Sequence, residues 1–147
     1  MKLSFGSMSK TRQKRTILFV CVENAGRSQM AEGFFRKYAP VGCEPISAGT
    51  KPVSQINPIV TQAMDEVGVD IKQQKPKDIT EDMMRNSAKI VNMGCMDKSF
   101  CPTLFIPNLI DWRIEDPKGK SIEQIIEIRD DIEQKVKQLV TNLPKDN

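Results

Sequence analysis

The sequence predicts a single α/β domain in which helices flank a short, four-stranded parallel sheet. Short apolar, β-rich segments alternate with amphipathic helical segments at the spacing of β-α-β units, which favours parallel strands. The length of 147 residues suits one domain and allows a hydrophobic core without a disulfide or a metal. The sequence contains no internal repeat and no linker, so we expect one domain.

The chain is expected to begin with a leader and then to enter the sheet. Residues 1–15 are polar, basic and without hydrophobic periodicity, which predicts a disordered basic leader ahead of a domain over residues 16–147. Residues 16–22 are β-rich and almost wholly apolar, as expected of a central parallel strand that is covered on both faces. Residues 28–38 follow as a helix, with Ser28 placed to cap its first turn.

The middle of the chain predicts a second strand and two more helices. Residues 46–49 are typical of the end of a short strand. Asn57 and Pro58 form a good helix opening, and Gly68 suits the C-terminal cap of that helix. A short helix then opens at residues 80–82, where acidic side chains lie at the positive end of the helix dipole.

The last third of the chain completes the predicted sheet. Residues 88–93 predict the third strand, and residues 104–110, which Pro107 interrupts, predict the fourth. Ser121 and Gln124 form a capping-box pattern, and apolar residues recur on one face of the closing helix that follows them.

The composition excludes several kinds of site and partner. The chain has no histidine and four cysteines, so catalytic pairs that use histidine and histidine-ligated metal sites are impossible. The basic excess behind the net charge of +3 lies in the leader, and a near-neutral body argues against nucleic acid as a partner. No apolar run has the length of a membrane span or a signal peptide. We therefore expect a cytoplasmic monomer, in a compartment where cysteines are more often reactive than structural.

The segment after the first strand carries the predicted chemistry. Cys21, five residues, Arg27 and Ser28 lie where α/β sheets bind their ligands, at the carboxyl end of a strand and before a helix. Five intervening residues can curl the backbone into a cup of amides around an oxyanion, and this cup and Arg27 would favour the thiolate form of Cys21. Arg27 offers a planar fork for two anion oxygens, and Ser28 can donate a hydrogen bond to the sulfur. The remaining predicted anion-binding residues are Val22, Glu23, Asn24, Ala25 and Gly26. The competing interpretation is a buried strand cysteine and an unrelated surface arginine.

The other cysteines have more than one interpretation. Cys95 and Cys101 lie just past the third strand, at the same edge of the sheet as Cys21, and they are either partner thiols or two buried residues. Zinc binding by all four cysteines is disfavoured because the sequence has no closely spaced cysteine pair. Cys43 matches no chemical role and is interpreted as a structural thiol.

Without histidine, the general acid has to be a carboxyl group. Asp111, Glu115 and Asp116 all lie between the fourth strand and the last helix, so the residues alone leave three candidates. Asn24, which tolerates left-handed backbone, is expected to hold the shape of the loop with Ser47 as its partner.

Residues 21–34 resemble the active-site loop and first helix of thioredoxin-coupled arsenate reductases, which share their fold with low-molecular-weight protein tyrosine phosphatases. The resemblance extends from about residue 16 to the C-terminus. It includes residues 47–49 and the pair Asp116-Pro117. Gln29 favours the reductase branch, because the phosphatases usually have proline at that position.

The resemblance implies that the chain reduces arsenate to arsenite through a thiol relay. Cys21 attacks arsenate while Asp116, which matches the family's Asp-Pro, acts as general acid. Cys95 then attacks Cys21 and releases arsenite, and Cys101 attacks Cys95. Thioredoxin, with glutaredoxin as the alternative, reduces the resulting Cys95–Cys101 disulfide. The two cysteines are separated by one residue fewer than in the best-known reductases.

The resemblance also implies ligands. Phosphate and sulfate are expected to compete with arsenate for the oxyanion loop. In some reductases of the family a monovalent cation lies near residues that match Asn24, Glu32, Ser47 and Asp78, so potassium is the implied cofactor. Residues 75–77 differ from the usual segment beside that cation.

Two other functions compete with the reductase. A phosphatase acting on phosphotyrosine or a small phosphoester would need only Cys21, Arg27 and Asp116. Residues 118–120 are Lys-Gly-Lys, however, where the phosphatases generally carry aromatic residues beside the substrate. The third possibility is a non-catalytic oxyanion binder that acts as a thiol redox sensor.

Overall fold

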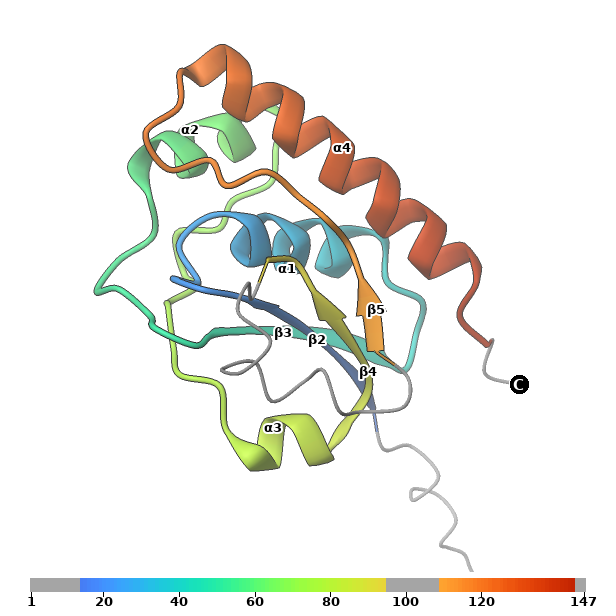
Figure 1. Cartoon of the computed structure of the whole chain (residues 1–147). Helices are drawn as coiled ribbons and strands as arrows, with labels where there is room; N and C mark the ends of the chain where they lie inside the picture. The colour runs from blue at the N-terminus through green and yellow to red at the C-terminus, as the bar shows by residue number, and fades with distance from the viewer. Residues whose placement is uncertain (1–13, 95–108, 145–147) are drawn as a thin grey trace, which may run out of the picture.

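One parallel sheet forms the centre of the molecule, as the sequence predicts (Figure 1). The structure is a computed structural model that describes residues 14–94 and 109–144. Within these residues the sheet has four strands in the order β3-β2-β4-β5. The strands are β2 (Arg15–Cys21), β3 (Cys43–Gly49), β4 (Ser87–Asn92) and β5 (Leu109–Asp111).

The register of the sheet places several strand ends at one edge. β2 lies between β3 and β4, and residues 17–21 of this central strand are fully buried. Cys21 pairs with Gly49 at the end of β3, and Asn92 pairs with Asp111 at the end of β5. Because all pairs are parallel, the segments that follow these residues leave the sheet on the same side. This edge is where a ligand site is expected.

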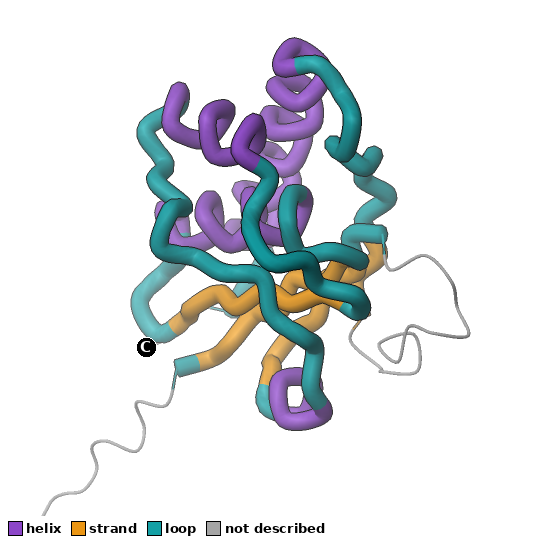
Figure 2. Tube along the Cα trace, turned by 90° about the vertical axis from the view of Figure 1, so that its left-hand side faces the viewer, coloured by secondary structure: helices purple, strands orange, loops and turns teal. Residues whose placement is uncertain are grey.

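Helices cover both faces of the sheet unequally. Three helices, α1 (Arg27–Tyr38), α2 (Pro58–Glu66) and α4 (Ile122–Thr141), lie on one face, and the short α3 (Glu81–Arg85) lies on the other (Figure 1). The view turned by 90° shows the same separation into helical and strand layers (Figure 2). The larger apolar core lies between the sheet and the three helices, and a smaller one lies under α3.

Local sequence signals set the ends of α2 and α4, whereas the predicted cap of α1 by Ser28 is wrong, because Ser28 lies inside that helix and Gly26 is its N-cap residue. The side chain of Asn57 accepts a hydrogen bond from the amide of Ile59, and Gly68 has a positive φ of 77° just beyond α2. At the start of α4 both hydrogen bonds of the predicted capping box are present between Ser121 and Gln124.

Some boundaries differ from the predictions. Arg15 belongs to β2, so the predicted leader is too long at its end, and residues 1–13 lie outside the described residues. β3 begins at residue 43, earlier than the segment singled out in the sequence, because pairing with β2 extends it. Most of the strand predicted over residues 104–110 falls outside the described residues, and β5 covers residues 109–111. No helix in the described ranges is long and apolar enough to cross a membrane.

Candidate active site

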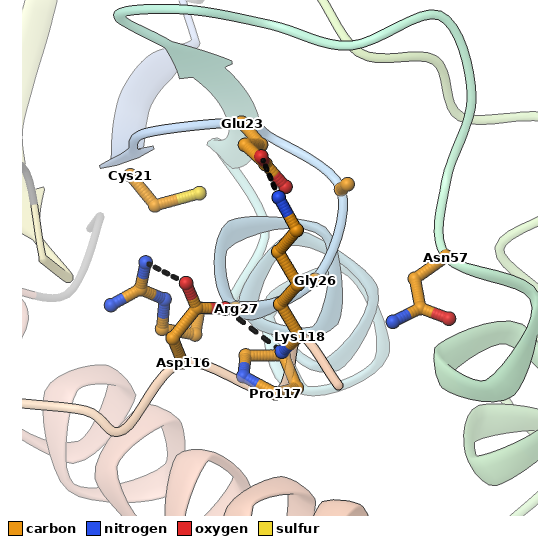
Figure 3. Close-up of a pocket in the computed structure, with 9 residues that line it drawn as sticks. Cys21, Glu23, Gly26, Arg27, Asn57, Asp116, Pro117 and Lys118 are labelled. Carbon is orange, nitrogen blue, oxygen red and sulfur yellow. Dashed lines mark hydrogen bonds and ion pairs between the residues drawn. The ribbon is translucent and has the colours of Figure 1, made fainter. Parts of the chain in front are cut away.

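The loop between β2 and α1 surrounds the sulfur of Cys21. Sγ of Cys21 lies 2.8 Å from Oγ of Ser28, in the first turn of α1, so the predicted contact is present. Cys21 is only 2% exposed, and Figure 3 shows its sulfur on the concave side of the loop. The thiol is thus oriented toward the space that the loop encloses, rather than toward the apolar core alone.

Four carbonyl groups of this loop point to the outside. Those of Cys21, Val22, Glu23 and Ala25 accept hydrogen bonds from backbone amides of residues 50–57. In a trans peptide the N–H points away from the preceding C=O, so the amides that follow these carbonyls point away from residues 50–57. The arrangement is the one that an oxyanion-binding cup requires.

Asn24 holds the loop in shape. It has a φ of 54°, the left-handed conformation expected from the sequence. Its Nδ2 donates hydrogen bonds to Oγ of Ser28 at 2.7 Å and to Oγ of Ser47 at 3.1 Å, and its Oδ1 accepts one from the amide of Lys77 at 2.9 Å. Nε2 of Gln29 donates to the carbonyl of Asn24 at 2.8 Å, which gives Gln29 a positioning role that the sequence alone did not indicate. Proline, usual in the phosphatases, could not make this bond.

Arg27 is buried and oriented by the segment before α4. Its NH1 donates to the carbonyl of Ile114 at 3.1 Å, and its NH2 lies 3.6 Å from Oδ2 of Asp116. Gly94 packs against the guanidinium so closely that any Cβ at residue 94 would clash with it. A buried arginine held in this way keeps its planar fork available at a defined place in the site.

The loop after β5 approaches the oxyanion loop through three consecutive residues. Asp116 pairs with Arg27, Pro117 packs on Gly26, and the Lys118 ammonium contacts the Glu23 carboxylate (Figure 3). The side chain of Asp116 is 55% exposed, so it can exchange protons with water. The two loops therefore meet around the sulfur of Cys21.

Of the three carboxyl candidates for the general acid, the structure places one at the site. Asp116 lines the pocket, whereas Glu115 pairs with Lys120 at 2.7 Å and Asp111 ends β5. Sequence spacing could not separate these three residues, because the path of the loop decides which side chain faces Cys21.

The two loops enclose a small pocket of about 40 Å³. One water needs a cavity of about 10–15 Å³ on this measure, so the space suits a small tetrahedral anion and little more. Asn57, Pro117 and Lys118 also line it, and of these three residues Asn57 has no signal in the sequence beyond its place at a helix opening. The described lining residues, none of which is aromatic, are Cys21, Glu23, Ala25, Gly26, Arg27, Asn57, Asp116, Pro117 and Lys118.

The remaining cysteines are not brought to Cys21 by the described structure. Cys95 and Cys101 lie outside the described residues, so the predicted relay stays a prediction. Cys43 begins β3, at the end of the sheet opposite to Cys21, and is buried in the larger core. This placement agrees with its interpretation as a structural thiol.

Three of the four residues expected near a monovalent cation make side-chain hydrogen bonds in the described structure. Oδ1 of Asn24 accepts from the amide of Lys77, and Oε1 of Glu32 accepts from Ser47 at 2.5 Å. The other oxygen of Glu32 pairs with an arginine on the same helix, and the backbone of Asp78 forms a β-bridge with Gly49 at the end of β3. The pKa of Lys77 is lowered because the side chain is partly buried, and the nearby Glu32 carboxylate opposes this shift without cancelling it. The monovalent cation near Asn24, Glu32, Ser47 and Asp78 stays a prediction.

The fold and this loop define a class of protein. A thiol at the end of the central parallel strand, enclosed by a Cys-x5-Arg loop and faced by a carboxyl group, is the arrangement of proteins that attack tetrahedral oxyanions through sulfur. Comparison with known sequences agrees. Over residues 16–147 the chain matches the low molecular weight phosphotyrosine protein phosphatase family, and it belongs to that family.

Individual relatives are arsenate reductases. The chain is 36% identical over 131 residues to arsenate reductase 2 of Staphylococcus saprophyticus, covering 88% of this chain and 98% of the relative. Its fold superposes with a TM-score of 0.72 on the thioredoxin-dependent arsenate reductase of Corynebacterium glutamicum, at 36% identity over 88% of this chain and 61% of that one. A structure of an arsenate reductase in the phosphate-binding state matches with a TM-score of 0.76 at 26% identity, covering 88% and 99% of the two chains.

Proposed function

We propose that this protein reduces arsenate to arsenite, with Cys21 as the nucleophile and Cys95 and Cys101 as the thiols that supply two electrons. The observation that carries the proposal is the pocket itself, which places a buried thiol, Arg27 and Asp116 around a space of oxyanion size. Identity of 36% to an arsenate reductase over 88% of the chain supports this substrate over a phosphoester.

The first step joins sulfur to arsenic. The thiolate of Cys21 forms an S–As bond, the As–O bond to the hydroxyl group of arsenate breaks, and that hydroxyl leaves as water with a proton from Asp116. Arg27 and the loop amides stabilise the negative charge on the remaining oxygens. The hydrogen bond from Ser28 stabilises the sulfur as an anion before attack and orients it during attack.

The second step moves two electrons to arsenic. Cys95 forms an S–S bond with Cys21, the electron pair of the S–As bond goes to arsenic, and arsenite leaves. Cys101 then attacks Cys95, which frees Cys21 as a thiolate. A dithiol donor reduces the Cys95–Cys101 disulfide and becomes oxidised in turn. The thioredoxin dependence of the related Corynebacterium glutamicum enzyme supports thioredoxin as this donor.

The lining of the described pocket fits a reductase that acts on a small anion. The described pocket-lining residues include no aromatic side chain that could stack on a phosphotyrosine ring.

The experiment is a coupled assay of arsenate with thioredoxin, thioredoxin reductase and NADPH. We expect turnover by the wild type, loss of turnover in Cys95→Ser and Cys101→Ser, and retention in the matched variant Cys43→Ser. Aryl phosphate hydrolysis that survives both substitutions, with no arsenate turnover, would show a phosphatase instead. Binding of phosphate and arsenate without turnover of either would show a redox sensor.

A further inference from the structure

An ion pair spans the pocket between its two loops. Nζ of Lys118 donates to Oε2 of Glu23 at 3.0 Å, and both residues line the pocket. Figure 3 shows the side chain of Lys118 extending from the loop before α4 across to Glu23 in the oxyanion loop. We call these two residues the mouth pair.

The backbone below the mouth pair is held in place. Pro117 packs against Gly26, and the amide of Lys118 donates to Oδ1 of Asp116 at 3.0 Å. The Lys118 side chain therefore starts from a defined position on one side of the pocket and ends on the other. A substituent that extends from a bound anion between Glu23 and Lys118 has to displace this side chain.

The charges of the mouth pair suit this position. A carboxylate beside an anion-binding loop repels the ligand, and Glu23 is 31% exposed at this place. The hydrogen bond with Glu23 raises the pKa of Lys118, so its ammonium stays charged and neutralises that carboxylate. The pair thus removes the repulsion while occupying the space where a larger substrate would extend.

We propose that Glu23 and Lys118 determine specificity by closing the pocket to organic substituents, so that it admits a bare tetrahedral oxyanion and discriminates against its esters and organic derivatives. The inference rests on the proposed function in one respect, because arsenate is an unsubstituted tetrahedral oxyanion of this kind. Exclusion of substituted anions is a property of the pocket and holds whether or not arsenate is reduced.

The size of the effect follows from the exposure of the pair. Lys118 is 70% exposed, and an exposed ion pair contributes modestly, so opening it should change an affinity by up to about fivefold. We therefore expect graded discrimination, rather than complete exclusion of larger ligands.

The test compares the Kd of inorganic phosphate with that of phenylphosphonate, which has no ester bond to hydrolyse, on the reduced protein at mildly alkaline pH. Two double variants remove the pair. Glu23→Ala with Lys118→Ala removes charge and bulk, and Glu23→Gln with Lys118→Met removes charge while keeping side-chain length. We expect the wild type to prefer phosphate, and each double variant to narrow the ratio of the two Kd values by about fivefold. The matched control removes an exposed ion pair elsewhere, Asp65→Ala with Lys72→Ala, and should leave the ratio unchanged.

The inference would be overturned if the ratio of the two Kd values in the Glu23→Ala, Lys118→Ala variant stayed within about twofold of the wild-type ratio. Effects of that size are within the range of any surface change. A Kd ratio that narrows when Glu23 and Lys118 become alanine, but not when they become glutamine and methionine, would also overturn the inference. Side-chain bulk and not the ion pair would then control access to the pocket. These binding measurements need no reductase chemistry. Failure of the arsenate assay would therefore refute the proposed function alone. An unchanged ratio of the two Kd values would refute only the role of the mouth pair in specificity.

Discussion

Gly26 lies where the oxyanion loop meets the loop that carries Asp116, the proposed general acid, and its replacement by alanine tests how that carboxyl group is positioned. A Cβ at residue 26 would lie 2.6 Å from Cγ of Pro117, whereas ordinary van der Waals contact begins near 3.4 Å. One of the two loops would therefore have to move by roughly 0.8 Å, close to the 1 Å scale at which misplacement affects catalysis. Because Pro117 follows Asp116 directly, the carboxyl group would move with it.

A displacement of about 1 Å can lower a rate by about 100-fold, which corresponds to about 2.7 kcal/mol in the activation barrier. We expect Gly26→Ala to lower kcat for arsenate by about that factor. The Kd for phosphate should change much less, because Cys21 and Arg27 keep their places. The measurements are steady-state turnover with the thioredoxin system and equilibrium binding of phosphate.

The matched variant is Gly26→Ala combined with Pro117→Ala, which removes the atom that the new Cβ would meet. It should recover most of the activity of Pro117→Ala alone. Wild-type kcat in Gly26→Ala would refute the positioning argument. So would a folded double variant with no recovery, because the loss would then come from the oxyanion loop itself.

Two further predictions concern stability and titration. Asn24→Ala removes a fully buried side chain that makes three hydrogen bonds, so the free energy of unfolding in urea should fall by about 2 kcal/mol or more, and a loss below about 0.5 kcal/mol would contradict this. Tyr38, the only tyrosine of the chain, donates a hydrogen bond to Glu133, which raises the pKa of Tyr38 to about 12. Ultraviolet absorbance titration should show this value directly, and Glu133→Gln should move it toward 10.0. Since the folded pKa is the higher one, the stability from this bond is present below about pH 10 and is lost as the pH rises toward about 12.

Local patterns in the sequence were sufficient for the order of the elements and for the nucleophile. The apolar run before Cys21 requires a buried strand, and the glycine, arginine and serine after it require a loop that leads into a helix. The capping signals of α2 and α4 act within a few residues, so they could be interpreted without knowledge of the fold.

The partners of the nucleophile depend on contacts between distant segments. Three carboxyl groups lie within six residues, and only the packing of Pro117 on Gly26 determines that Asp116 is the one beside Arg27. The sequence shows Gln29 at a position where the phosphatases usually have proline. Its hydrogen bond to the Asn24 carbonyl, however, depends on how the loop curls. The Glu23–Lys118 ion pair joins residues 95 positions apart and has no local signal at all.

The sequence by itself therefore determined that this chain is a parallel α/β domain with a thiol-based oxyanion loop, because hydrophobic periodicity and the Cys-x5-Arg spacing are properties of neighbouring residues. The resemblance singled out Asp116, but only the tertiary structure places its carboxyl group beside Arg27 and shows which charged pair spans the pocket. The physical reason is that both depend on the approach of the loop after β5 to the loop after β2, and that approach is set by the packing of the whole sheet and its helices.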